Sequence, residues 1–153
     1  MKTYRRILVP LTAAGQCDTL LCRAAEIAQE HNAKMLVLRV LDIRSGFAPD
    51  GPAALRPEEA AARRAPNVKK RLDLLLARNN LGWAEAKVQW GEPKKVLAEV
   101  IDSWQPDLVL ACAGDLPQGF VHGSDLLTVN CRSLLKRLIE VFHHPVHRPA
   151  GAG

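Results

Sequence analysis

The sequence predicts an α/β protein with an open parallel sheet and helices on both faces, similar to Rossmann-type folds. Apolar runs of strand length alternate along the chain with amphipathic stretches of helical length. Three of these runs lack polar alternation, which is typical of strands that are buried on both faces. Alternation of strands and helices favours parallel strands joined by right-handed crossovers. The 153 residues are expected to form a single domain.

The N-terminal part contains two of the buried strands. Residues 6–11 (RILVPL) form the first strand, which ends near Pro10 because proline cannot donate a hydrogen bond to a sheet. Residues 18–32 place leucine, isoleucine and alanine along one side, as in an amphipathic helix. Residues 34–41 (KMLVLRVL) form the second strand.

The middle of the chain begins with an irregular segment. Residues 42–57 contain glycines and prolines without periodicity, which predicts a long functional or mobile loop. A helix begins near Pro57, and Pro66 is expected to kink it or to divide it into two helices. Residues 67–80 continue the helical pattern with apolar residues on one side.

The remaining elements follow the same alternation. Residues 83–90 alternate polar and apolar side chains, which predicts a half-exposed edge strand. Residues 94–104 and 128–141 have helical periodicity, and residues 108–113 form another buried strand.

The predicted boundaries divide the chain into a domain and a tail. Residues 1–142 form the α/β domain, and residues 143–153 form a polar, flexible tail. The sheet is expected to have five strands, or four regular strands and a weak last strand at 142–147.

Composition narrows the function classes. No apolar run approaches the ~20 residues of a membrane span, and the N-terminal apolar run is too short for a signal peptide. We therefore expect a cytoplasmic protein without membrane association. Net charge is +5, and aromatic residues make up 5%, which gives nucleic-acid binding no support. Basic clusters are interpreted as solvated helix faces, with an anionic partner as the alternative: Arg63, Arg64, Lys69, Lys70, Arg71, Arg132, Lys136 and Arg137.

Cysteine and histidine offer two further sites. The four cysteines form no C-x-x-C pair and are expected to be free thiols. Cys112, at the end of a buried strand, is either an inert core thiol or a thiol sensor. The histidines at 143, 144 and 147 suggest a metal sensor, but no cysteine or carboxylate ligand stands beside them, so no metal is predicted.

The segment 105–124 combines a strand end, glycines at 114, 119 and 123, and Ser124 shortly before a predicted helix. Such loops cradle phosphate, because glycines admit close approach and a helix start offers free N–H groups. The alternative is an ordinary surface loop. In open parallel sheets, ligands lie beyond the carboxyl ends of the strands, where the loops after Leu11, Leu41 and Ala113 would converge.

Several stretches together resemble the universal stress protein family. They are residues 6–10 (RILVP), 23–28 (RAAEIA), 31–38 (HNAKMLVL), 91–93 (GEP) and 106–109 (PDLV). Their order and spacing carry the resemblance more than any single motif. It implies a five-stranded parallel α/β domain that acts in stress responses, is usually a homodimer, and binds ATP in some members.

The resemblance also implies nucleotide contacts. ATP-binding members have Asp two residues after the first-strand proline, and G-x-x-G followed nine residues later by G-S or G-T. Here Thr12 replaces that Asp, and the first two glycines align with Cys112 and Asp115, whose carboxylate would repel a triphosphate. The corresponding nucleotide-contacting residues are Pro10, Thr12, Val40, Gly114, Gly123 and Ser124.

Two main hypotheses follow. Residues 128–138 (TVNCRSLLKRL) resemble tandem-domain members without an intact ATP motif. This favours a non-enzymatic stress-response domain that acts through protein contacts or weak ligand binding, with no obligatory cofactor. The alternative is an ATP- or AMP-binding sensor, or a slow ATPase, at the glycine-rich loop. The metal or thiol sensor is a third hypothesis.

Overall fold

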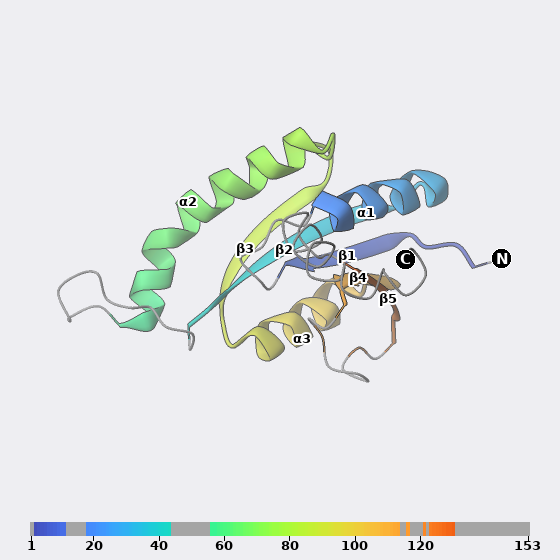
Figure 1. Ribbon diagram of the computed structural model, residues 1–153. Helices are drawn as coiled ribbons and strands as arrows, with labels where there is room; N and C mark the ends of the chain where they lie inside the picture. Colours follow the sequence, from blue (N-terminus) through green and yellow to red (C-terminus); the bar gives the residue numbers. More distant parts are fainter. Residues whose placement is uncertain are drawn as a thin grey trace, which may run out of the picture.

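Five parallel strands form one sheet in the order β3-β2-β1-β4-β5 (Figure 1). The computed structural model describes residues 2–11, 18–43, 56–113, 116, 121 and 123–130. Every strand pairing is parallel, which confirms the predicted fold class. The strands are β1 (Arg6–Leu11), β2 (Lys34–Asp42), β3 (Glu85–Gly91), β4 (Leu108–Cys112) and β5 (Asp125–Val129).

Helices cover both faces of this sheet. The helices α1 (Asp18–His31) and α2 (Pro57–Arg78) lie on one face, and α3 (Pro93–Trp104) lies on the other (Figure 1). Strands β1, β2 and β3 advance in one direction, so right-handed crossovers place α1 and α2 together. The chain then returns past β1 to β4, and the same handedness places α3 opposite. Strand order therefore reverses between β1 and β4.

Two apolar clusters fill the space between the layers. Because side chains alternate along a strand, Ile7 and Val9 face α1 and α2, whereas Leu8 faces α3. The first cluster also contains Leu20 and Leu76, and the second contains Leu97. Burial on both faces explains why the inner strands are continuous apolar runs.

Helix α2 runs through Pro66 without interruption, so of the two predicted alternatives, a kink or two helices, the division into two helices does not occur. Its N-terminal turns lie at an angle to the remainder, as a kink requires (Figure 1). Proline removes one helical hydrogen bond, and Pro66 is exposed, so water can solvate the carbonyl group that loses its partner.

The fifth strand is Asp125–Val129, so a helix does not begin at Thr128 as predicted. Strand β5 pairs with β4 from Leu108↔Asp125 to Cys112↔Val129. The predicted strand at 142–147, the tail at 143–153 and the three histidines of the tail lie outside the described residues, as does most of the predicted 42–57 loop.

The cysteines differ from the prediction of free thiols. Cys22 is free and exposed, whereas Cys112 is disulfide-bonded to a partner outside the described residues. The absence of a C-x-x-C pair did not exclude this disulfide, because disulfides join cysteines that are close in space rather than in sequence.

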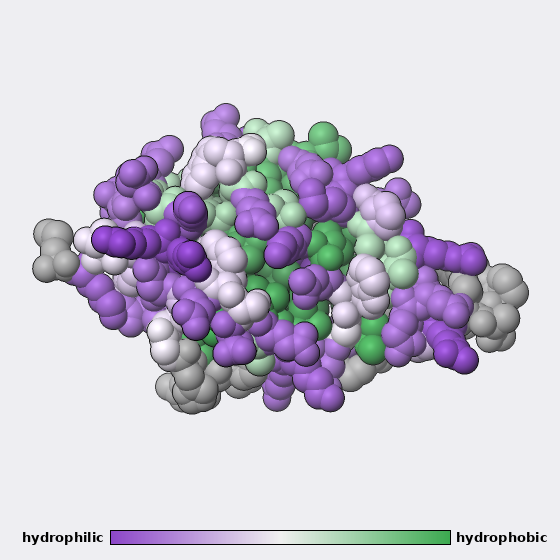
Figure 2. Space-filling view, turned by 180° about the vertical axis from the view of Figure 1, so that it is seen from behind, coloured by the Kyte–Doolittle hydropathy of each residue, from purple (hydrophilic) through white to green (hydrophobic). Residues whose placement is uncertain are grey.

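The exterior is mostly polar, with local apolar areas. Figure 2 shows a hydrophilic surface that surrounds an apolar area when the molecule is viewed from behind. Within the described ranges, no helix combines the length and apolar character that crossing a bilayer requires. Large apolar side chains that remain exposed are Leu74, Trp83, Trp90, Leu126 and Leu127.

Candidate functional site

Gly123 and Ser124 lie at the amino end of β5, not at the carboxyl end of the sheet as predicted. The Ser124 hydroxyl donates to the Pro106 carbonyl oxygen at 2.5 Å. The Asp125 N–H donates to the Asp107 carbonyl oxygen at 3.0 Å, and a strand rather than a helix follows. No helix start with free N–H groups therefore follows Ser124.

The strand register separates these two residues from Pro10. Ile7 pairs with Leu108, which places Pro10 about four residues beyond the level of Ser124. This offset corresponds to about 13 Å along the strands. Gly123 has a φ of 77°, which glycine adopts without steric strain, so this residue is a glycine because the turn into β5 requires it.

Pro10 and Val40 do lie together at the carboxyl edge. Pro10 pairs with Leu38, two residues before Val40, and both Pro10 and Val40 are buried. Val40 belongs to the cluster beneath α3, and the partly buried Leu116 and Val121 pack against the same cluster. Apolar side chains of the β4–β5 connection thus cover part of the face on which a nucleotide was predicted.

The remaining predicted contacts, Thr12 and Gly114, lie outside the described residues, as does Asp115. Of the six predicted nucleotide contacts, the structure therefore brings Pro10 and Val40 together and separates Gly123 and Ser124 from them.

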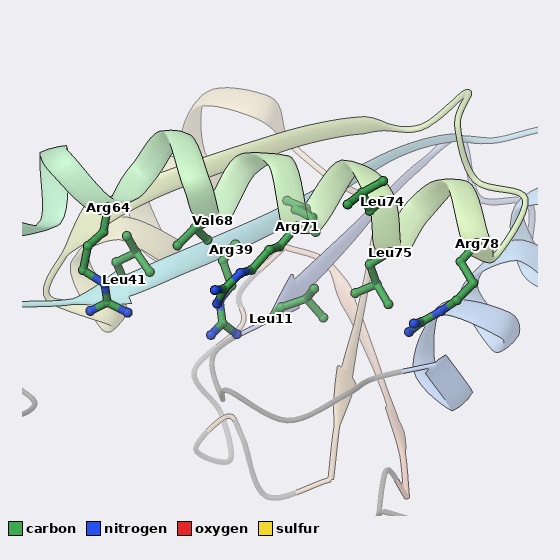
Figure 3. A pocket seen from close by; sticks show the side chains of 10 residues that line it. Leu11, Arg39, Leu41, Arg64, Val68, Arg71, Leu74, Leu75 and Arg78 are labelled. Carbon is green, nitrogen blue, oxygen red and sulfur yellow. The ribbon is translucent and has the colours of Figure 1, made fainter.

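A groove on the opposite face of the sheet has a different character. It encloses about 550 Å³ between α2 and the carboxyl ends of β1 and β2 (Figure 3). We call it the arginine groove. Its lining residues are Leu11, Arg39, Leu41, Arg64, Val68, Arg71, Leu72, Leu74, Leu75 and Arg78.

Three of its arginines come from one side of α2. Arg64, Arg71 and Arg78 recur every seven residues, which is close to two helical turns. Successive members are therefore about 10 Å apart along the helix axis. Arg39 of β2 and Arg71 of α2 extend into the same part of the groove (Figure 3). Helix and sheet thus present positive charge from two walls.

Among the ten lining residues that the structure describes, none is acidic. Asp18, at the start of α1, pairs with the Arg78 guanidinium at 3.1 Å. A hydrogen bond from the Asn79 amide at 2.9 Å, followed by the Arg78 contact, lowers the pKa of Asp18. Arg39 and Arg64 also interact with neighbouring groups, whereas Arg71 has no ion pair or hydrogen bond within the described part of the chain.

The described lining residues can bind an anion but offer no catalytic group. Guanidinium groups stay protonated at physiological pH and match carboxylate or phosphate oxygens in bidentate geometry. The other six described lining residues are aliphatic, so this described part of the lining contains no nucleophile, carboxylate or imidazole. Across the described ranges, no group of three metal-ligating side chains lies together.

Sequence analysis missed this groove because it treated the basic residues of 63–71 as a solvated cluster. The informative signal was the heptad spacing of Arg64, Arg71 and Arg78, with Val68 and Leu75 on the same side of the helix.

Comparison with solved structures shows the same fold in several proteins of low sequence identity. Universal stress protein UspA from Lactobacillus plantarum is 19% identical, with a TM-score of 0.59 over 85% of this chain and 100% of that one. A family member from Arabidopsis thaliana, solved with AMP bound, is 15% identical, with a TM-score of 0.53 over 86% and 94%. The universal stress protein from Archaeoglobus fulgidus, in complex with dAMP, is 14% identical, with a TM-score of 0.54 over 84% and 100%.

Family-level comparison gives a broader match. A search of curated proteins finds no match. The model of the universal stress protein family matches residues 3–124, which is most of the chain and includes β1 to β4. The chain therefore belongs to the universal stress protein family.

Proposed function

We propose that this protein is a non-enzymatic stress-response domain that acts through weak ligand binding or protein contacts. The placement of Gly123 and Ser124 carries this proposal. They lie about 13 Å from the level of Pro10 and precede a strand, so they do not complete a phosphate cradle at the carboxyl edge. The arginine groove supports a binding role, since its described lining residues are cationic or aliphatic and include no catalytic group.

Calorimetry with ATP and AMP, with and without Mg²⁺, tests this proposal alongside an assay for released phosphate. We expect no phosphate release above buffer and no saturable heat at millimolar nucleotide. The variant Ser124→Ala should behave as the wild type, because its hydroxyl bonds to Pro106 at the amino edge. Turnover by the wild type that Ser124→Ala abolishes would contradict both the function and the placement.

The second candidate function is a nucleotide sensor. Two structural neighbours were solved with AMP or dAMP, and another universal stress protein, 16% identical, was solved in complex with cAMP. Pro10 and Val40 lie together at the carboxyl edge, where the family resemblance assigns nucleotide contacts. Saturable binding of AMP that is lost in Val40→Ala but retained in Ser124→Ala would favour this candidate.

The proposed domain is a cytoplasmic homodimer that assembles through β5. Within the described residues this strand forms one edge of the sheet, and Leu126 and Leu127 are each 38% exposed on it. Edge strands with exposed apolar side chains favour pairing with another chain. Light scattering of the eluting protein should give twice the monomer mass, and Leu126→Lys should shift it to the monomer. An unchanged mass in that variant would exclude β5 as the interface.

A further inference from the structure

We propose that the arginine groove binds a small organic anion that carries two or more negative charges on an apolar body. The groove lies on the face covered by α2, whereas Pro10 and Val40 contribute to the face covered by α3. The sheet separates the two positions. Binding in the groove is therefore independent of whether a nucleotide contacts Pro10 and Val40.

Charge is the first argument. Four guanidinium groups line the groove, and no acidic residue is among its described lining residues. Asp18 pairs with Arg78 at one end, while Arg71, near the middle, has no ion pair or hydrogen bond to the described residues. An anion at Arg71 would offset the repulsion between like charges, and it would be held from α2 and from Arg39 of β2 (Figure 3).

The spacing of the groove arginines indicates that the ligand carries more than one negative charge. Arg64 and Arg71 are about 10 Å apart along the helix axis, as are Arg71 and Arg78. A single small ion contacts one of these positions at a time. A ligand with two separated anionic groups can engage Arg71 and a neighbouring arginine together, which gives both affinity and orientation.

The apolar body follows from the rest of the lining. Leu11, Leu41, Val68 and Leu75 lie between the arginines (Figure 3). An inorganic anion would leave this surface in contact with water, whereas an aromatic or aliphatic body would bury it. The volume of about 550 Å³ is within the range of small-molecule sites.

Titration with the disulfonate dye bis-ANS tests the proposal. The dye has two anionic groups on an aromatic body, and its fluorescence rises on apolar contact. Arg71→Ala removes the central cation, and the matched control Arg63→Ala makes the same chemical change on an adjacent, exposed part of α2 that does not line the groove. Val68→Glu keeps all four arginines and places a carboxylate four residues after Arg64 and three before Arg71, where it competes with the ligand.

We expect Arg71→Ala to weaken dye binding by about tenfold or more, from loss of a charge-assisted hydrogen bond. Arg63→Ala should bind as the wild type, and Val68→Glu should lose saturable binding. Circular dichroism should show folded protein in each case, since glutamate has a higher helix propensity than valine. Equal weakening by Arg63→Ala and Arg71→Ala, or undiminished binding to Val68→Glu, would overturn the proposal. The nucleotide titrations probe the other face, so the two tests fail independently.

Discussion

The amino and carboxyl edges of the sheet differ in the charged side chains that they carry and in the partners of those side chains. At the amino edge, Asp107 accepts the N–H groups of Arg5 and Arg6 at 2.8 and 2.9 Å. Asp125 accepts the Tyr4 hydroxyl at 2.8 Å and pairs with the Lys2 ammonium at 2.7 Å. Asp107 and Asp125 thus have donors from the distant N-terminal segment.

The carboxyl edge carries the opposite arrangement. The arginine groove there gathers four cations, and the part of its lining that the structure describes holds no carboxylate. Paired carboxylates at the amino edge tie the N-terminal segment to the sheet, which is a structural role. Arg71 in the groove has no such ion pair or hydrogen bond to the described residues. The contrast is therefore between charged side chains that support the fold at the amino edge and a groove arginine that we propose binds a ligand.

The largest effect is expected at Cys112, where the carboxyl edge is fixed covalently. Cys112→Ser should lower the free energy of unfolding by about 2–4 kcal/mol under oxidising conditions, as loss of a disulfide typically does. Urea unfolding with and without reductant checks this. Reductant should bring the wild type to the level of the variant. Equal stability of the oxidised wild type and the variant would show that the covalent link adds nothing.

The next effect concerns the amino edge. Asp107→Ala removes two hydrogen bonds to the backbone of Arg5 and Arg6 and should cost about 1–2 kcal/mol, because both are charge-assisted but partly solvated. Asp102→Ala, an exposed position on α3, is the matched control and should change stability by less than about 0.5 kcal/mol. Dye binding in the groove should be unchanged in both variants. Loss of binding in Asp107→Ala would remove the distinction between the edges.

Acidic pH should lower the free energy of unfolding, because protonation of Asp125 weakens its interactions at the amino edge. The hydrogen bond from Lys2, and next that from Tyr4, lower the pKa of Asp125 in the folded state. A lowered folded pKa means that the stabilisation is present above the unfolded value of about 3.9 and is lost as pH falls through the folded pKa.

Urea midpoints measured from neutral to acid pH test this expectation. The difference between the wild type and Asp125→Asn should shrink as pH falls, and Lys2→Met should reduce the same pH dependence because it removes the first cause of the shift. A difference that stays constant across this range would contradict the role of Asp125.

The smallest effect on stability is expected in the groove itself. Arg71→Ala should change the free energy of unfolding by less than about 0.5 kcal/mol, because the side chain is exposed and has no partner within the described residues. Thermal unfolding beside Arg63→Ala checks this. A large loss of stability would mean that Arg71 supports the fold and would weaken the contrast between the edges.

Sequence reasoning succeeded where burial dominates. The runs around Leu8, Leu36 and Leu110 are apolar on both faces, so periodicity was sufficient to predict β1, β2 and β4. Strand β5 was missed because Leu126 and Leu127 are exposed at an edge, and the leucines that follow favour a helix.

The site was harder to predict than the fold. Gly123 and Ser124 match a phosphate motif by type, but their position depends on the register between β4 and β5, which no local pattern reveals. The groove forms because Arg39 lies close to α2, although about thirty residues separate them in the chain. The sequence therefore contains the arginines but does not reveal that they line one groove.

The most direct test follows the arginine Nε–Hε resonances by nuclear magnetic resonance during titration with bis-ANS, whose two anionic groups stand on an aromatic body. The account predicts saturable shifts for Arg39, Arg64 and Arg71, and none for Arg5 and Arg6 at the amino edge. Shifts of similar size at both edges, or none in the groove, would contradict the assignment of binding to the carboxyl edge.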